Sequence, residues 1–66
     1  MSEDALDAEA RHRLRHDLRT PLTIVAGFAE VLGSDRDISD ADRREYAARI
    51  QTAAAEIGTL IDRALE

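Results

Sequence analysis

The octet HDLRTPLT, residues 16–23, places a proline inside an otherwise regular helical pattern. Before and after it, apolar residues recur at intervals of three and four. This spacing predicts one amphipathic helix over about residues 5–32. Proline in a helix interior costs about 3 kcal/mol or more, so such a residue marks a candidate functional position. The expected apolar seam consists of Leu14, Leu18, Leu22, Val25, Ala29 and Leu32.

A second apolar seam follows a short polar connector. Residues 33–35, Gly-Ser-Asp, are typical of a helix end, and the connector is expected over about residues 33–39. Ser39 is the expected N-cap of a second helix over about residues 40–64. Helices of roughly 40 Å and 37 Å joined by so short a connector predict an antiparallel hairpin. The second seam consists of Tyr46, Ile50, Ala53, Ile57, Leu60 and Ala64.

Chain length limits how this hairpin is stabilised. A single domain over residues 1–66 is expected, and two helices of this size do not close a core on their own. The apolar stripe is wider than a two-stranded coiled coil requires. We therefore expect an all-α fold in which the antiparallel hairpin homodimerises into a four-helix bundle.

The composition argues against several classes of function. The net charge of -5 opposes nucleic-acid binding, and an aromatic content of 3% provides little for base stacking. The chain has no Cys for a disulfide or thiolate metal site. We expect no direct membrane contact, because no apolar run approaches the length of a bilayer span and no signal-peptide core follows Met1.

Two clusters contain residue types that ligate metals. His12 and His16 have the i, i+4 spacing of a zinc-binding pair, but no third ligand is evident. The acidic residues around the connector lack the glycine and terminal glutamate of a calcium loop. No metal or cofactor is therefore expected to bind this chain. These acidic residues are Asp35, Asp37, Asp40 and Asp42.

His16 is expected to point away from the apolar seam. At about 100° per residue, it lies roughly 160° from Leu18 around the helix. Thr20, Thr23 and Gly27 lie within about 40° of the pole opposite the seam. A neutral imidazole is a competent nucleophile near neutral pH, especially when a carboxylate such as Asp17 fixes its tautomer. The alternative is an ordinary solvated histidine beside a solvated acid.

The octet resembles the H-box of bacterial sensor histidine kinases, found in their dimerisation and histidine phosphotransfer (DHp/HisKA) domain. This resemblance implies that His16 is the phospho-acceptor and Asp17 the general base of autophosphorylation. It also implies that Asp17 and Thr20, in a D-x-x-T arrangement, orient water when the partner regulator is dephosphorylated. Thr20 has the alternative of bonding back to a helical carbonyl. Arg19 either pairs with a local acid, meets phosphate or is solvated.

Pro21 removes the N–H that would bond the carbonyl of Asp17. The helix is therefore expected to kink just below His16, at a point where signal-driven motion changes access to the histidine. The alternative is that residues 5–32 form two separate helices. The kink is favoured because the apolar seam continues across Pro21 without a phase break.

The resemblance implies a role in two-component signalling as a protein histidine kinase, with this chain supplying only the phospho-acceptor domain. His16 accepts phosphoryl from an ATP-bound catalytic domain and passes it to an Asp on a response regulator receiver domain. No Gly-rich phosphate loop is present, so ATP and Mg²⁺ are expected on a separate domain that would begin where this chain ends, near Glu66. A cytoplasmic location is expected, whether or not the parent kinase is membrane-anchored.

Two other functions stay open from the sequence. The chain is either a stand-alone phosphorelay adaptor or a plain helical dimerisation module in which the octet is coincidental. In the signalling role, outward residues near the histidine are expected to select the regulator. Examples are Thr23, Gly27, Ala55 and Thr59.

Overall fold

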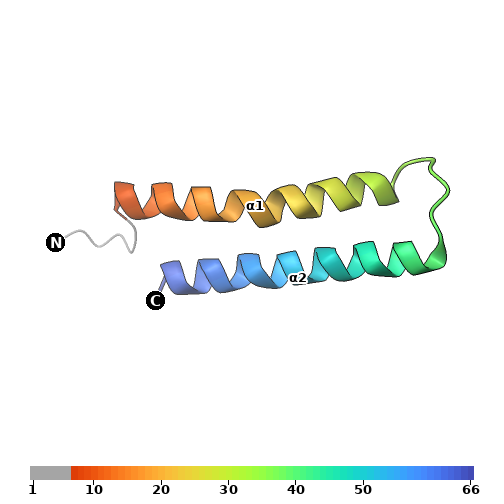
Figure 1. The fold of residues 1–66 in the computed structure, drawn as a ribbon. Helices are drawn as coiled ribbons and strands as arrows, with labels where there is room; N and C mark the ends of the chain where they lie inside the picture. The colour runs from red at the N-terminus through yellow and green to blue at the C-terminus, as the bar shows by residue number, and fades with distance from the viewer. Residues whose placement is uncertain (1–6) are drawn as a thin grey trace.

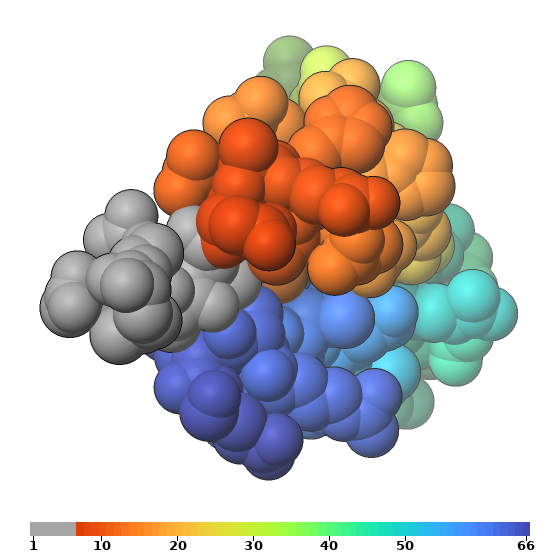
Figure 2. All heavy atoms as spheres, turned by 90° about the vertical axis from the view of Figure 1, so that its left-hand side faces the viewer, coloured from red at the N-terminus to blue at the C-terminus, as the bar shows by residue number. Residues whose placement is uncertain are grey.

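The computed structural model describes residues 7–66, which form a helical hairpin. Helix α1 spans Ala8–Leu32 and helix α2 spans Asp40–Ala64. The helices run antiparallel and side by side along a molecule about 55 Å long (Figure 1). At one end, the start of α1 packs against the end of α2, as Figure 2 shows. The described residues contain no strand, and the predicted all-α hairpin is confirmed.

Side chains and backbone groups define both ends of α1. Asp7 is the N-cap, and its carboxylate accepts a hydrogen bond from the Ala10 amide at 2.7 Å. The expected helix start at residues 5 and 6 lies outside the described residues. At the other end, the Gly33 amide donates to the Ala29 carbonyl at 3.0 Å. Gly33 has a φ of -90°, so α1 ends without a left-handed residue.

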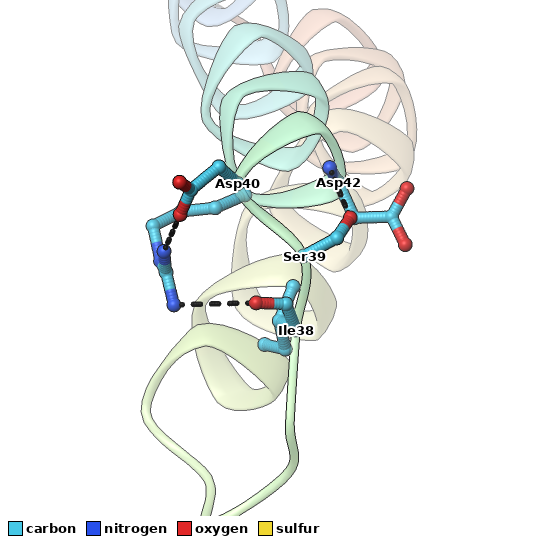
Figure 3. Close-up of polar contacts among 5 residues, drawn as sticks. Ile38, Ser39, Asp40 and Asp42 are labelled. Atoms are coloured by element: carbon cyan, nitrogen blue, oxygen red, sulfur yellow. Dashed lines mark hydrogen bonds and ion pairs between the residues drawn. The ribbon is translucent and has the colours of Figure 1, made fainter.

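The start of α2 is tied to the connector by two polar contacts (Figure 3). Ser39 is the N-cap, as predicted, and its hydroxyl accepts a hydrogen bond from the Asp42 amide at 3.0 Å. The Arg43 guanidinium donates to the Asp40 carboxylate at 2.9 Å and to the Ile38 carbonyl at 3.5 Å. These contacts stabilise the first turn of α2 and fix its entry from the connector.

The side of α1 that faces α2 differs from the predicted seam. Leu22 is 51% exposed and Ala29 is also exposed, so these two seam residues are not buried against α2 within the hairpin. Pro21 and Phe28, one position earlier in each case, face α2 instead. Burying these larger side chains removes more apolar surface from water than burying an alanine would. The inner residues of α1 are Leu14, Leu18, Pro21, Val25, Phe28 and Leu32.

The inner side of α2 matches the predicted seam. Its six predicted seam residues, spaced by four and three from Tyr46 to Ala64, are all partly or fully buried. The Tyr46 ring stacks on the Phe28 ring, with centroids 5.0 Å apart and planes inclined by 26°. This aromatic pair joins the two helices in the half of the hairpin nearest the connector.

The hairpin encloses only a thin core. Among the described residues, Pro21 and Ala53 alone are classed as buried. Several large apolar side chains remain exposed, namely Leu22, Ile24, Ile61 and Leu65. Within residues 7–66, neither helix combines the length and apolar character that a membrane span requires. The four exposed apolar side chains named above lie on the surface of the hairpin.

Candidate functional site

His16 lies in the third turn of α1 and points away from α2. Its side chain is 81% exposed, whereas Leu14 and Leu18 on either side are partly buried against α2. These two leucines fix the rotation of the helix, and the outward direction predicted for His16 is confirmed. Thr20 and Thr23 are exposed along the same helix. The imidazole is thus accessible to a macromolecular partner without any movement of the hairpin.

Asp17 is the carboxylate next to the imidazole. His16 Nδ1 and Asp17 Oδ1 are 3.5 Å apart, which is longer than an ordinary N–H···O hydrogen bond. The Asp17 side chain is 55% exposed, so solvent screens this contact. When Nδ1 carries the proton, it faces Asp17 and leaves a lone pair on Nε2. No described residue bonds Nε2, and this atom is free to attack an electrophile.

Thr20 lies one helical turn beyond His16. No hydrogen bond from its hydroxyl to a helical carbonyl is found within residues 7–66, which argues against the back-bonded alternative. Its exposed hydroxyl therefore remains available to water or to a partner near His16. Asp17, His16 and Thr20 share one segment of α1, as the D-x-x-T arrangement requires.

Pro21 is buried, unlike His16, Asp17 and Thr20, which are exposed. Its ring is the largest fully buried side chain among the described residues and faces α2. Helix α1 continues without interruption through Pro21 (Figure 1), so the alternative of two separate helices is wrong. Because the proline nitrogen has no hydrogen, the Asp17 carbonyl lacks its usual helical donor at this point. The kink itself stays a prediction.

A basic surface surrounds His16 on the exposed side of α1. His12, Arg15 and Arg19 line a shallow hollow together with His16. Within residues 7–66, no three His, Cys, Asp or Glu side chains are grouped closely enough to share a metal ion. Of the acidic residues near the connector, Asp40 is paired with Arg43. The guanidinium groups of Arg15 and Arg19 therefore place positive charge at the border of the hollow around His16.

An interhelical groove adds residues that the sequence analysis did not identify. It lies beside the helix contact and contains an ion pair of 2.9 Å between Glu45 and Arg49. Its α2 residues include four that directly precede inner-seam residues, so an examination of the positions flanking the seam would have found them. A smaller hollow includes Thr23 and Gly27, two of the predicted partner-selecting residues. The larger groove is lined by Ile24, Phe28, Glu45, Ala48, Arg49, Thr52, Ala53 and Glu56.

Comparisons with known proteins agree with this geometry. Residues 11–66 match the family model of the His Kinase A (phospho-acceptor) domain. The chain is 31% identical over 49 residues to the sensor histidine kinase YcbM of Bacillus subtilis (strain 168). The matched segment covers 74% of this chain and 16% of that relative. No solved structure matches the chain.

Proposed function

The chain belongs to the His kinase A family, the phospho-acceptor domains of sensor histidine kinases, and from this premise we propose that His16 is its phospho-acceptor residue. The observation that supports this assignment is the 81% exposed imidazole whose Nδ1 faces Asp17. His12 is also exposed, but no carboxylate bonds it within the described residues. The two histidines therefore differ in their neighbours rather than in their access to solvent.

The proposed reaction is nucleophilic attack by an imidazole on a phosphoryl group. His16 Nε2 attacks the γ-phosphorus of ATP, an N–P bond forms, and the bond from phosphorus to the bridging oxygen of ADP breaks. Asp17 holds the Nδ1 proton, stabilises the positive charge that develops on the ring, and accepts that proton as general base. In the second step, a regulator aspartate oxygen attacks the phosphorus, and the N–P bond breaks to regenerate the imidazole.

Two further residues of the octet have proposed roles in regulation. Thr20, with its unbonded hydroxyl, orients the water that hydrolyses the regulator's acyl phosphate. Pro21 provides a flexible point in α1, because the Asp17 carbonyl lacks a helical partner there. A change in helix bend at Pro21 then alters how His16 and Asp17 are presented to each partner.

ATP and Mg²⁺ are supplied to this reaction by a separate catalytic domain. The residues around His16 are basic or neutral apart from Asp17, and offer no carboxylate cluster for a magnesium ion. The domain therefore acts as the substrate of that catalytic domain and as the phosphodonor to a receiver domain. Such a role belongs in the cytoplasm, where ATP is available. The interhelical groove that contains Ile24, Phe28 and Arg49 is the proposed contact surface for the receiver.

A second copy of the chain completes the core. Leu22 and Ala29 lie on the flank of α1 opposite Asp17 and Ile24, which border the hollows between the helices. On α2, Ala54 and Ile61 lie on the corresponding flank. The hairpin buries few side chains alone, and a domain of this size needs further apolar burial to be stable. Packing this flank against its equivalent in another copy gives the proposed homodimeric four-helix bundle.

Phosphoryl acceptance is the experiment that tests the proposed function. The chain is mixed with the catalytic domain of a related sensor kinase and Mg-ATP, and its intact mass is followed at neutral and alkaline pH. We expect one acid-labile phosphate that His16→Gln abolishes and His12→Gln spares. Equal loss in both variants, or no phosphate on a folded chain with an active catalytic domain, would contradict the assignment.

A further inference from the structure

The hollow beside His16 contains two arginines that have no side-chain partner among the residues that the structure describes. It is lined by His12, Arg15, His16 and Arg19 and has a volume of about 290 Å³. All four residues belong to α1, and no α2 residue lines it. His12 and Arg19 stand at i-4 and i+3 relative to His16, positions that adjoin it on the helix surface, and Arg15 borders the hollow from the preceding position. Within the hairpin, the hollow is thus formed by one helix.

Three arginines outside the hollow are paired with carboxylates. Arg13 lies 3.5 Å from Glu9, and the ion pairs Arg43–Asp40 and Arg49–Glu45 are 2.9 Å long. The guanidinium groups of Arg15 and Arg19 form no ion pair or hydrogen bond with any residue in the described range 7–66, and the same holds for Arg36, Arg44 and Arg63 elsewhere in the hairpin. What sets Arg15 and Arg19 apart is their place beside the His16 imidazole. The one carboxylate next to the hollow, Asp17, faces Nδ1 of His16. Within residues 7–66, no other carboxylate is therefore paired with the arginines beside the imidazole.

Local charge departs from that of the whole chain. The chain carries a net charge of -5. Residues 8–20 nevertheless contain four arginines against two acids, Glu9 and Asp17. The opposite end of the hairpin is acidic, with Asp35 and Asp37 in the connector and Asp40 and Asp42 in the first turn of α2. Four of the nine arginines thus lie close to the histidine in sequence, whereas the three near the connector, Arg36, Arg43 and Arg44, stand among more numerous acids.

The charges decide which ligand the hollow accepts. Two histidines at i, i+4 have the spacing for a divalent metal ion, but two adjacent guanidinium groups repel such a cation, and no third ligand is grouped with them. A phosphoryl dianion fits better, because guanidinium groups form paired, charge-assisted hydrogen bonds with phosphate oxygens. When bound to Nε2 of His16, that group would stand beside both arginines.

We propose that Arg15 and Arg19 hold the phosphoryl group on His16, acting as positioning residues that protect the phosphohistidine from hydrolysis, with His12 closing the hollow. The inference rests on the proposed role of His16. In hydrolysis, water forms a P–O bond while the N–P bond breaks, and protonation of the phosphohistidine makes the imidazole a better leaving group. Positive charges nearby oppose that protonation. A unit charge about 6 Å away in water changes a pKa by about half a unit.

The effect of the two arginines on the lifetime of the phosphohistidine is measurable. At mildly alkaline pH, where only a minor fraction of the phosphohistidine is protonated, the two charges together lower that fraction on the order of threefold to tenfold, with the smaller value at higher ionic strength. The hydrolysis rate follows this fraction. The Arg15→Gln/Arg19→Gln double variant should therefore lose the phosphate of His16 about threefold to tenfold faster than the native chain at about pH 8 and low salt.

The test uses the whole chain and phosphoramidate, a small phosphodonor that needs no catalytic domain. Phosphorus NMR follows the His16 signal, which is assigned by its absence in His16→Gln. Arg13→Gln is the matched control because Arg13 is paired with Glu9 and lies outside the hollow. It should behave as the native chain. Arg15→Lys/Arg19→Lys should restore most of the lifetime because it keeps both charges, and circular dichroism verifies that each variant is helical.

Equal phosphate lifetimes in the native chain and the Gln double variant would overturn the proposal. An equal effect in 10 mM and 1 M salt would also contradict an electrostatic cause, because the Debye length falls from about 30 Å to about 3 Å between these two concentrations. Failure of His16 to react while His12 does would also overturn the proposal, because Arg15 and Arg19 would then not hold a phosphoryl group on His16. None of these results depends on a kinase, so they are distinguishable from failure of autophosphorylation, which the catalytic-domain experiment measures separately.

Discussion

Phe28 and Tyr46 stack across the hairpin, with ring centroids 5.0 Å apart. Because both rings are partly buried between α1 and α2, Phe28→Ala should lower the free energy of unfolding by about 2 kcal/mol, less than a fully buried phenylalanine. A double-mutant cycle with Phe28→Leu and Tyr46→Leu should give a coupling of about 0.5–1.5 kcal/mol. Urea unfolding at one fixed chain concentration measures both quantities. Additive single effects would show that the rings contribute by burial alone.

The rotation of α1 explains what the sequence could and could not predict. The pairs Pro21/Leu22 and Phe28/Ala29 each offer two adjacent candidates for the inner side. The predicted seam took the second member of each, because proline was considered as a helix breaker rather than as an inner residue. The choice between them depends on which side chains meet α2, here the Tyr46 ring. Helix periodicity alone does not contain that information.

The outward direction of His16 did not depend on this ambiguity. Leu14 and Leu18 face α2 in either case, and His16 lies between them on the far side of the helix. The groove that contains Arg49 and Thr52 was not predicted, because its walls come from both helices. The pattern of one helix does not reveal which flank of its neighbour lies opposite. Residue roles carried by one helix were thus easier to propose than surfaces shared by two.

Substitution of Pro21 by alanine should stabilise the isolated hairpin slightly. Alanine restores a donor to the Asp17 carbonyl, worth about 3 kcal/mol relative to proline in a helix interior. Loss of the buried ring offsets about 1–2 kcal/mol of this gain. The expected net effect is therefore about 1 kcal/mol of stabilisation in thermal or urea unfolding. In a full-length kinase, the same change should alter the balance of kinase and phosphatase activities.

Val25→Ala is the control for the packing part of that result. Val25 lies one turn further along the inner side of α1 and has a normal backbone N–H. Its truncation should destabilise the hairpin by about 1–2 kcal/mol. If Pro21→Ala destabilises the hairpin to the same extent, packing of the ring outweighs the missing hydrogen bond. Pro21 would then act as a core residue and not as a flexible point in α1.

Leu22→Glu should weaken self-association while leaving the helices intact. Leu22 is 51% exposed on the apolar flank assigned to the dimer contact, and a charge buried there would have no partner. Light scattering across a range of chain concentrations should show a dimer for the native chain and a shift toward monomer for the variant. Thr23→Glu adds the same charge one residue later on the outward surface and should remain dimeric. A monomeric native chain at tens of micromolar would contradict the four-helix bundle.

Asp17→Asn should slow phosphorylation of His16. The amide is nearly the size of the carboxylate but does not accept the Nδ1 proton or stabilise positive charge on the ring. General acid–base contributions are typically about 10²–10⁴-fold, and the 3.5 Å contact between exposed groups favours the lower end. Single-turnover rates with an excess of catalytic domain and Mg-ATP measure the effect. Asp17→Glu should recover much of the rate, whereas an unchanged rate in Asp17→Asn would make Asp17 an ordinary surface acid.

Thr20→Ala should separate the two activities proposed for the octet. Its hydroxyl makes no back-bond within the described residues, so its removal leaves the helix unaffected and withdraws only the group that orients water. We expect regulator dephosphorylation to fall about tenfold or more, from the loss of one positioning hydrogen bond, while phosphoryl acceptance by His16 stays within about twofold. Thr20→Ser keeps a hydroxyl and should retain the phosphatase activity. If acceptance and dephosphorylation fall together, Thr20 acts on His16 itself rather than on the attacking water.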